Sequence, residues 1–217
     1  MALSLQSLTD GLLGLLFPDR CAGCGQVGSL LCAGCLARLQ PYQAAMPRHQ
    51  PVLDAIGVAF LFDAPLREAI HQLKYERVRR MAAPLAALLH EYLQRQPLPA
   101  DVLIPVPLHP RRFAERGFNQ SELLANHLAA SLRLPVLTTG LVRQRNTATQ
   151  VGLNMQQRQQ NVQDAFLWQA RVPPPPRVLL LDDVFTTGAT MLACAAALRR
   201  AGAREVRALA LGRSHHE

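Results

Sequence analysis

Apolar residues follow two alternating patterns from about residue 55 onward. Short apolar runs of the length of buried strands lie at 56–62, 102–108, 135–142, 177–183 and 205–211. Between these runs, apolar residues recur at helical spacing over 65–75, 81–95, 119–132 and 188–202, and Gly202 stands where a glycine often ends a helix. Strands that alternate with helices are typical of a mainly parallel sheet flanked by helices. We therefore predict an α/β domain over residues 55–217.

The first 54 residues have a different character. The opening segment, MALSLQSLTDGLLGLLF, is apolar, but it lacks a basic start and contains Asp10. It predicts a short amphipathic helix rather than a signal peptide. No run approaches the roughly 18 apolar residues of a membrane span, so we expect a cytoplasmic protein. Residues 1–40 would form this helix and a cysteine module, and the proline-containing stretch 41–54 would be a linker.

The charge balance indicates an anionic partner. The chain has 217 residues, 49% of them hydrophobic and 18% charged, which is ordinary for a folded protein. Lys and Arg number 23 against 15 Asp and Glu, giving a formal net charge of +8. Such an excess favours nucleic acid or a multiply phosphorylated small molecule. The alternative is that the extra arginines are solvated surface residues.

Four of the five cysteines form a metal-binding pattern. Two C-x2-C pairs, Cys21 with Cys24 and Cys32 with Cys35, are separated by seven residues. Two such pairs place four thiolates around a tetrahedral zinc, which would be structural because sulfur fills every position. The alternative, a pair of disulfides, is disfavoured in a reducing compartment. Cys194 lies in an apolar helical segment and is expected to be a buried, inert thiol.

The segment VLLLDDVFTTGAT, residues 178–190, ends an apolar strand in two carboxylates, Asp182 and Asp183. A loop of small residues follows, before a predicted helix: Thr186, Thr187, Gly188, Ala189 and Thr190. Backbone N–H groups that converge at a helix N-terminus bind a phosphate. Adjacent carboxylates accept hydrogen bonds from vicinal ribose hydroxyls. The combination predicts a ribose 5-phosphate site.

Other basic segments could contact a pyrophosphate or DNA. The loop after the strand at 102–108 and the helix start beyond it supply the candidates Arg111, Arg112, Arg116, Asn119 and Gln120. The polar segment 141–161 adds Arg143, Arg145 and Arg158. The run Lys74, Tyr75, Arg77, Arg79 and Arg80 combines cations with an aromatic ring that could stack a base. For each segment the alternative is an ordinary solvated surface.

Two of these segments resemble known families. VLLLDDVFTTGAT is similar to the phosphoribosyl pyrophosphate (PRPP) motif of type I phosphoribosyltransferases. LIPVPLHPRRFAERGFNQSELLA (103–125), IHQLKY (70–75) and the four-cysteine module resemble the ComF/GntX family, competence protein F-like proteins, over essentially the whole chain. The resemblance implies a type I phosphoribosyltransferase-like fold. Asp182 and Asp183 would then contact the ribose 2′ and 3′ hydroxyls, residues 186–190 would hold the 5′-phosphate, and segment 141–161 would be the hood over PRPP.

The resemblance leaves three functions open. ComF-type proteins take part in natural transformation or DNA utilisation, handling imported single-stranded DNA beside a helicase partner. That role, with a PRPP-binding pocket, is the one we favour. The alternative is an active Mg²⁺-dependent phosphoribosyltransferase in nucleotide metabolism, although no residue in the sequence identifies the acceptor base. A third interpretation is a scaffold whose zinc module docks a partner.

Overall fold

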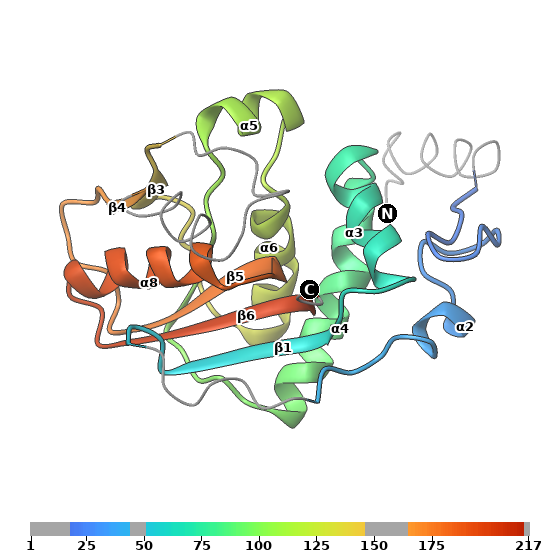
Figure 1. Cartoon of the computed structure of the whole chain (residues 1–217), viewed down its shortest axis with the longest axis horizontal. Helices are drawn as coiled ribbons and strands as arrows, with labels where there is room; N and C mark the ends of the chain where they lie inside the picture. The colour runs from blue at the N-terminus through green and yellow to red at the C-terminus, as the bar shows by residue number, and fades with distance from the viewer. Residues whose placement is uncertain (1–17, 44–50, 146–164, 215–217) are drawn as a thin grey trace, which may run out of the picture.

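A parallel sheet forms the centre of the protein (Figure 1). The computed structural model describes residues 18–43, 51–145 and 165–214. The strands of this sheet are β1 (Ala55–Leu61), β2 (Val102–Pro105), β5 (Arg177–Phe185) and β6 (Glu205–Arg213). They lie in the order β1-β6-β5-β2, and every neighbouring pair is parallel. The predicted parallel sheet is confirmed.

Helices cover both faces of the sheet (Figure 1). On one face lie α3 (Leu66–Tyr75), α4 (Ala82–Arg95) and α6 (Gln120–Leu132), and on the other lies α8 (Ala189–Arg200). Away from the sheet faces lie α2 (Ala33–Leu36) and α5 (Pro110–Arg116), and the 3-10 turn η1 spans Arg79–Met81. Side chains of β5 alternate between the two faces. Leu179 and Leu181 pack with α3, α4 and α6, whereas Val178 and Leu180 pack with α8. A strand covered on both sides must be apolar at consecutive positions, as residues 178–181 are.

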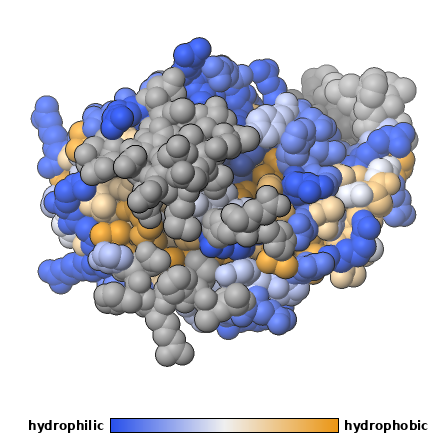
Figure 2. Space-filling view, viewed as in Figure 1, coloured by the Kyte–Doolittle hydropathy of each residue, from blue (hydrophilic) through white to orange (hydrophobic). Residues whose placement is uncertain are grey.

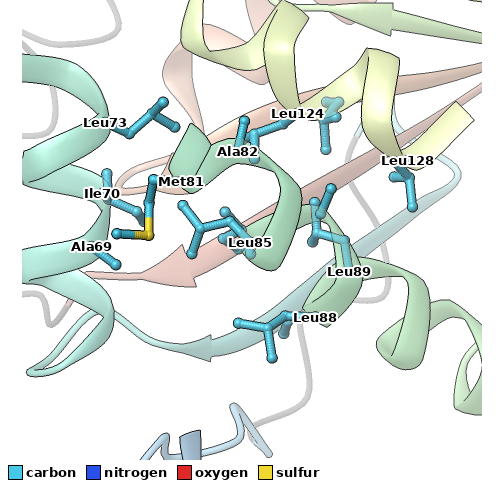
Figure 3. Packing of buried hydrophobic residues seen from close by; sticks show 14 of the residues in the cluster. Ala69, Ile70, Leu73, Met81, Ala82, Leu85, Leu88, Leu89, Leu124 and Leu128 are labelled. Atoms are coloured by element: carbon cyan, nitrogen blue, oxygen red, sulfur yellow. The ribbon is translucent and has the colours of Figure 1, made fainter. Parts of the chain in front are cut away.

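The core on one face of the sheet joins three helices and η1. Figure 3 shows buried side chains that these elements contribute, among them Ala69, Ile70, Leu73, Met81, Ala82, Leu85, Leu88, Leu89, Leu124 and Leu128. Burying one such leucine stabilises the fold by about 1.5–3 kcal/mol. Because Leu66 and Leu73 are fully buried, α3 is fixed along its length. Its last two residues, Lys74 and Tyr75, therefore have a defined position.

The prediction of a strand over residues 135–142 was wrong for most of that range. Val136 makes a single parallel bridge with Leu103 of β2. The chain then leaves the sheet, and Leu141–Arg143 form β3, which pairs antiparallel with β4 (Phe166–Trp168). Pro135 has no N–H to donate to a ladder, which limits this strand to a short contact at the sheet edge.

Residues 110–116 form the helix α5, where the sequence analysis places a loop. Pro110 occupies its first position, and His109 Nδ1 accepts a hydrogen bond from the Arg111 N–H at 3.2 Å. Gly117 ends the helix in a left-handed conformation. Proline at the start and glycine past the end are helix signals. Gly202 follows α8 with φ +107°, which confirms the glycine predicted at that end.

Some expectations fall outside the described residues. The N-terminal helix predicted within residues 1–17 is one, and the larger part of the segment 141–161, with Arg158, is another. The division at residues 40 and 54 stays a prediction. Over the parts of the chain that the structure describes, no helix has both the length and the apolar character needed to cross a membrane.

Candidate functional site

A cavity of about 290 Å³ opens where β2 and β5 end. Elements far apart in the sequence contribute to its wall: the end of α3, the segment after β2, helices α5 and α6, β3, the end of β5 and the start of α8. The polar residues that line it are Lys74, Tyr75, Arg112, Arg116, Gln120, Arg143, Asp182, Asp183, Thr186 and Thr190. Ligands of open parallel sheets bind at this edge, beyond the carboxyl ends of the strands.

The two aspartates have different partners. Asp182 Oδ1 accepts hydrogen bonds from Ser121 Oγ at 2.8 Å and from the Asp183 N–H at 2.9 Å. Asp183 is buried, forms an ion pair with Lys74 Nζ, and accepts a hydrogen bond from Gln120 Nε2 at 3.2 Å. Gln120 in turn accepts from Arg116 through its amide oxygen. One carboxylate thus faces a hydroxyl, whereas the other faces a cation and an amide.

These surroundings separate the two pKa values. Burial, together with the negative charge of Asp183, raises the pKa of Asp182 to about 7. Burial also acts to raise the pKa of Asp183, but the charge of Lys74 outweighs it and the pKa falls below its ordinary value. Near neutral pH, Asp183 is therefore the carboxylate that carries the negative charge, whereas Asp182 keeps its proton to a higher pH than an ordinary aspartate. Lys74 is a partner that the sequence interpretation missed as a site residue.

The loop between β5 and α8 is held in a tight conformation. Gly188 has φ +81°, and a Cβ there would lie 2.4 Å from Cζ of the Phe185 ring. Only glycine fits this position. Arg213, near the end of β6, donates to the carbonyl oxygens of Phe185 and Thr186, and its guanidinium lies 4.9 Å from the Phe185 ring centroid. The loop is therefore fixed from the β6 side. No signal in the sequence identified Arg213.

The loop residues themselves divide between the cavity and the helix start. Thr186, Gly188 and Thr190 line the cavity, whereas Thr187 and Ala189 are not among its lining residues. Thr187 Oγ1 accepts a hydrogen bond from the N–H of Ala189, the first residue of α8, at 3.3 Å. The phosphate-binding role predicted for all five residues stays a prediction.

The arginine candidates divide in the same way. Arg112, Arg116 and Arg143 line the cavity, together with Gln120. Arg111 points outward in a 3.4 Å ion pair with Glu115, and Arg145 is exposed. Asn119 is buried, where it caps α6 by accepting from the Ser121 N–H and donates to the Val106 carbonyl. Its side chain is used within the fold.

Two cationic side chains of the cavity, Arg112 and Arg143, repel each other. Arg143 is buried and its guanidinium lies 5.4 Å from the Phe166 ring centroid. Burial lowers the pKa of Arg143, and the charge of Arg112 lowers it further. An anion between these two guanidinium groups would offset both effects. The arrangement is suited to a second anionic group beside the loop of residues 186–190.

Arginines of the basic run 74–80 form contacts with other parts of the fold. The Arg77 and Arg79 side chains donate to the carbonyl oxygens of Glu115 and Gly117, at 3.1 and 3.2 Å, and so hold the C-terminal end of α5. Arg80 forms a 2.8 Å ion pair with Asp19, next to the cysteine module. Neither interpretation of this run, DNA binding or a solvated helix end, predicts the bridge to α5, and contact with DNA stays a prediction.

The four cysteines Cys21, Cys24, Cys32 and Cys35 come together as predicted. Their sulfur atoms all lie within 4.8 Å of one another, and those of Cys24 and Cys32 are 3.6 Å apart. Sulfurs bound to one zinc at about 2.3 Å lie about 3.8 Å from each other, so the donor set fits a zinc ion. The four thiols are free rather than paired in disulfides. Cys194 is buried in the core, as expected.

Neighbouring groups support the thiolates and attach the module to the domain. The Cys32 N–H donates to Cys21 Sγ at 3.3 Å, and Arg38 Nη2 donates to Cys35 Sγ at 3.0 Å. Such donors orient ligands and stabilise negative sulfur. Gly23 lies so close to Pro65 that a Cβ would approach the proline Cβ to 2.4 Å. These residues can hold a structural zinc ion.

Comparison with known proteins defines the family. The model of the phosphoribosyl transferase domain matches residues 119–217, from α6 to the C-terminus. The DNA utilization protein YhgH of Salmonella typhi is 37% identical over 203 residues, which is 89% of this chain and 84% of that protein. The chain belongs to the ComF/GntX family. The competence protein F of Haemophilus influenzae is 32% identical over 207 residues, covering 89% of this chain and 90% of that relative.

A more distant ComF relative extends the comparison. The competence protein ComFC of Streptococcus pneumoniae is 29% identical over 164 residues, 74% of this chain and 70% of its own. Together with the parallel sheet, the domain match confirms the predicted fold class, a phosphoribosyltransferase-like domain with a four-cysteine cluster near its N-terminus.

Proposed function

We propose that this ComF-family protein binds PRPP, or a similar ribose 5-phosphate, in the cavity and single-stranded DNA on the arginines of α5 beside it. One observation carries the proposal: an acidic pair, a glycine-containing loop and three arginines face the same cavity. The curated relatives are named for competence and DNA utilization. We infer the same role here, in the cytoplasm and beside a helicase of the DNA-uptake machinery.

The ribose would lie over the end of β5. Its 2′ and 3′ hydroxyls are two adjacent donors, and Asp182 and Asp183 are two adjacent acceptors. A hydrogen bond to a charged group contributes about 1.5–3 kcal/mol. Lys74 keeps Asp183 ionised, so that at least one carboxylate is a strong acceptor at neutral pH. A neutral cavity wall would give no such preference for a diol.

The phosphates would lie on either side of the ribose. The N-terminus of α8 and the loop 186–190 offer N–H and hydroxyl donors to the 5′-phosphate. Arg112, Arg116 and Arg143 would neutralise the pyrophosphate. Mg²⁺ would arrive with the substrate, because it binds phosphate oxygens and water in preference to a protein cage.

The DNA strand would lie outside the cavity. Deoxyribose lacks the 2′ hydroxyl, and within a strand its 3′ oxygen is esterified, so neither donor is available to the carboxylates. A phosphodiester there would also be repelled by Asp183. Figure 2 shows hydrophilic residues over α5 and α3, the two helices beside the cavity. Arg111 on α5 is outside the cavity lining, and its weak surface pair with Glu115 leaves it able to contact a phosphate.

A second candidate is a catalytic transferase, favoured by the domain match over 119–217. In that case an acceptor would displace pyrophosphate from C1 of the ribose, and the protein would position the reactants and stabilise the leaving group. Release of pyrophosphate from PRPP in the presence of a base would identify this activity. Stable PRPP binding without release would leave the pocket as a ligand-binding site.

The salt dependence of binding separates the strand site from the cavity. Each phosphate contact of the strand should lower oligonucleotide affinity by about 2.6-fold between 50 and 200 mM salt. PRPP affinity should fall less, because salt screens partly buried charge pairs less than exposed ones. Fluorescence anisotropy with a labelled oligonucleotide and calorimetry with PRPP would measure these two affinities at each salt concentration.

The matched variant is Arg111→Gln, since Arg111 lies outside the cavity lining. It should lower the salt slope for the oligonucleotide by about 0.7 and leave PRPP binding unchanged. Oligonucleotide binding that does not respond to salt, or that PRPP abolishes completely, would contradict two separate sites.

A further inference from the structure

Tyr75 is an aromatic side chain that the fold leaves open at the cavity. It is the last residue of α3, it lines the cavity, and its exposed fraction is 65%. Other large apolar residues are exposed in the described part of the chain, among them Val172 and Phe113. Tyr75 is the member of this exposed set that lines the cavity.

A guanidinium group faces the tyrosine ring from another element. Cζ of Arg116, on α5, lies 5.5 Å from the Tyr75 ring centroid, within the range of a cation–π contact. The His71 ring packs on the same tyrosine with centroids 4.9 Å apart and planes tilted by 46°. Two flat groups, one aromatic and one cationic, thus meet at the entrance of the cavity.

The position of this pair is fixed by the site below it. Arg116 donates to Gln120, and Gln120 donates to Asp183. Asp183 pairs with Lys74, the residue before Tyr75. Contacts therefore run from Tyr75 through Arg116, Gln120 and Asp183 back to α3. Arg77 and Arg79 hold the end of α5 in addition, so that the two flat groups are preorganised for a ligand.

We propose that Tyr75 and Arg116 form a nucleobase-binding subsite at the entrance of the cavity. A base offers a π face that stacks on an aromatic ring, and this interaction tolerates any base sequence. The arginine adds attraction to the ring and to a neighbouring phosphate. The inference rests on the proposed function, since it names what binds next to the ribose-phosphate cavity.

The base can come from two sources. It can belong to a nucleotide whose ribose and phosphate occupy the cavity, or to a strand held on α5. In the first case Tyr75 would add to the affinity of a nucleoside 5′-monophosphate relative to ribose 5-phosphate. In the second it would add to the affinity of an oligothymidylate relative to an abasic oligonucleotide of equal length.

The test compares these four probes on wild-type protein and on Tyr75→Leu. Tyr75→Phe keeps the ring. Val172→Ala is the control, because Val172 is an exposed apolar residue that lies outside both the cavity lining and α5. We expect Tyr75→Leu to weaken binding of one base-containing probe, either the nucleotide or the oligothymidylate, by about fivefold or more. Binding of the abasic or base-free probe of that arm should be unaffected, and Tyr75→Phe and Val172→Ala should behave as wild type.

Two results would overturn the subsite: base-containing probes that bind wild-type protein no better than base-free ones, or equal losses for both kinds of probe in Tyr75→Leu. Thermal unfolding of each variant confirms that exposed-surface changes leave the fold intact. PRPP titration is read separately. If wild-type protein does not bind PRPP, the proposed function fails, while the oligothymidylate arm still decides the subsite.

Discussion

At the scale of single residues, the adjacent aspartates at the end of β5 differ because of groups contributed by other elements. Ser121 of α6 gives Asp182 a neutral donor, and Lys74 of α3 gives Asp183 a charge. The aspartates themselves could be predicted from the sequence, because two carboxylates at the end of an apolar strand have no packing purpose. Lys74 could not be assigned to them, since it lies more than a hundred residues earlier and only the fold brings it close.

The raised pKa of Asp182 makes a prediction about stability. Its folded value, about 7, lies above the ordinary 3.8, so the folded state binds a proton more tightly than the unfolded state. The unfolding free energy should therefore fall as pH rises from about 4 to about 7. Asp182→Asn removes this penalty. It should raise the melting temperature at pH 8 by roughly 2–4 °C for each kcal/mol gained, and have less effect at pH 5.

Asp101→Asn is a control for which we expect a change in stability of the opposite sign. Arg177 lowers the pKa of Asp101 through a hydrogen bond and its charge, so this carboxylate contributes stability above its ordinary pKa and loses it in acid. Asp101→Asn should thus lower stability at pH 8 rather than raise it. A melting-temperature difference between Asp182→Asn and wild type that is the same at pH 5 and pH 8 would contradict the account of Asp182.

At the scale of elements, the sequence predicted the four sheet strands from their continuous apolar runs and the four long helices from apolar residues at helical spacing. It missed α5, whose seven residues include no buried side chain. Its ends are set by Pro110 and Gly117, a signal present in the sequence. The bridge from the run 74–80 to α5 has no sequence signal, because Arg77 and Arg79 bind backbone carbonyls. A carbonyl acceptor can belong to any residue.

We expect the cysteine module to depend on a bound zinc ion for its stability. Cys21 and Cys35 belong to the apolar cluster that includes Leu66 of α3, so loss of metal should disturb the adjoining core. Cys21→Ser should reduce bound zinc below one equivalent and lower the melting temperature by several degrees, because zinc binding contributes directly to folding.

Metal content by atomic absorption and thermal unfolding would measure both effects. Cys194→Ser is the matched control: Cys194 is buried away from the cluster, in the other core, so this change should cost stability while keeping a full equivalent of zinc. A full equivalent retained by Cys21→Ser would refute the four-thiolate site.

At the scale of the whole molecule, the parallel sheet determines where chemistry can occur. Parallel strands end at one edge, and there the chain gathers a lysine from α3, arginines from α5 and β3, and the loop before α8. The cysteine module lies beyond α3, at one end of the molecule (Figure 1). It contacts the domain through Arg80 and Pro65. The molecule thus separates a bracing module from a ligand-binding edge.

The most direct test of the central claim is calorimetric titration with PRPP and Mg²⁺, on wild-type protein and on Asp182→Asn/Asp183→Asn. The account predicts saturable binding to wild type. It also predicts at least about 10-fold weaker binding to the double variant, which loses the charged acceptor Asp183, whose hydrogen bond contributes about 1.5–3 kcal/mol. A single cooperative unfolding transition and a full equivalent of zinc would show that the variant is folded. Equal PRPP affinity in the two proteins would contradict the assignment of this cavity.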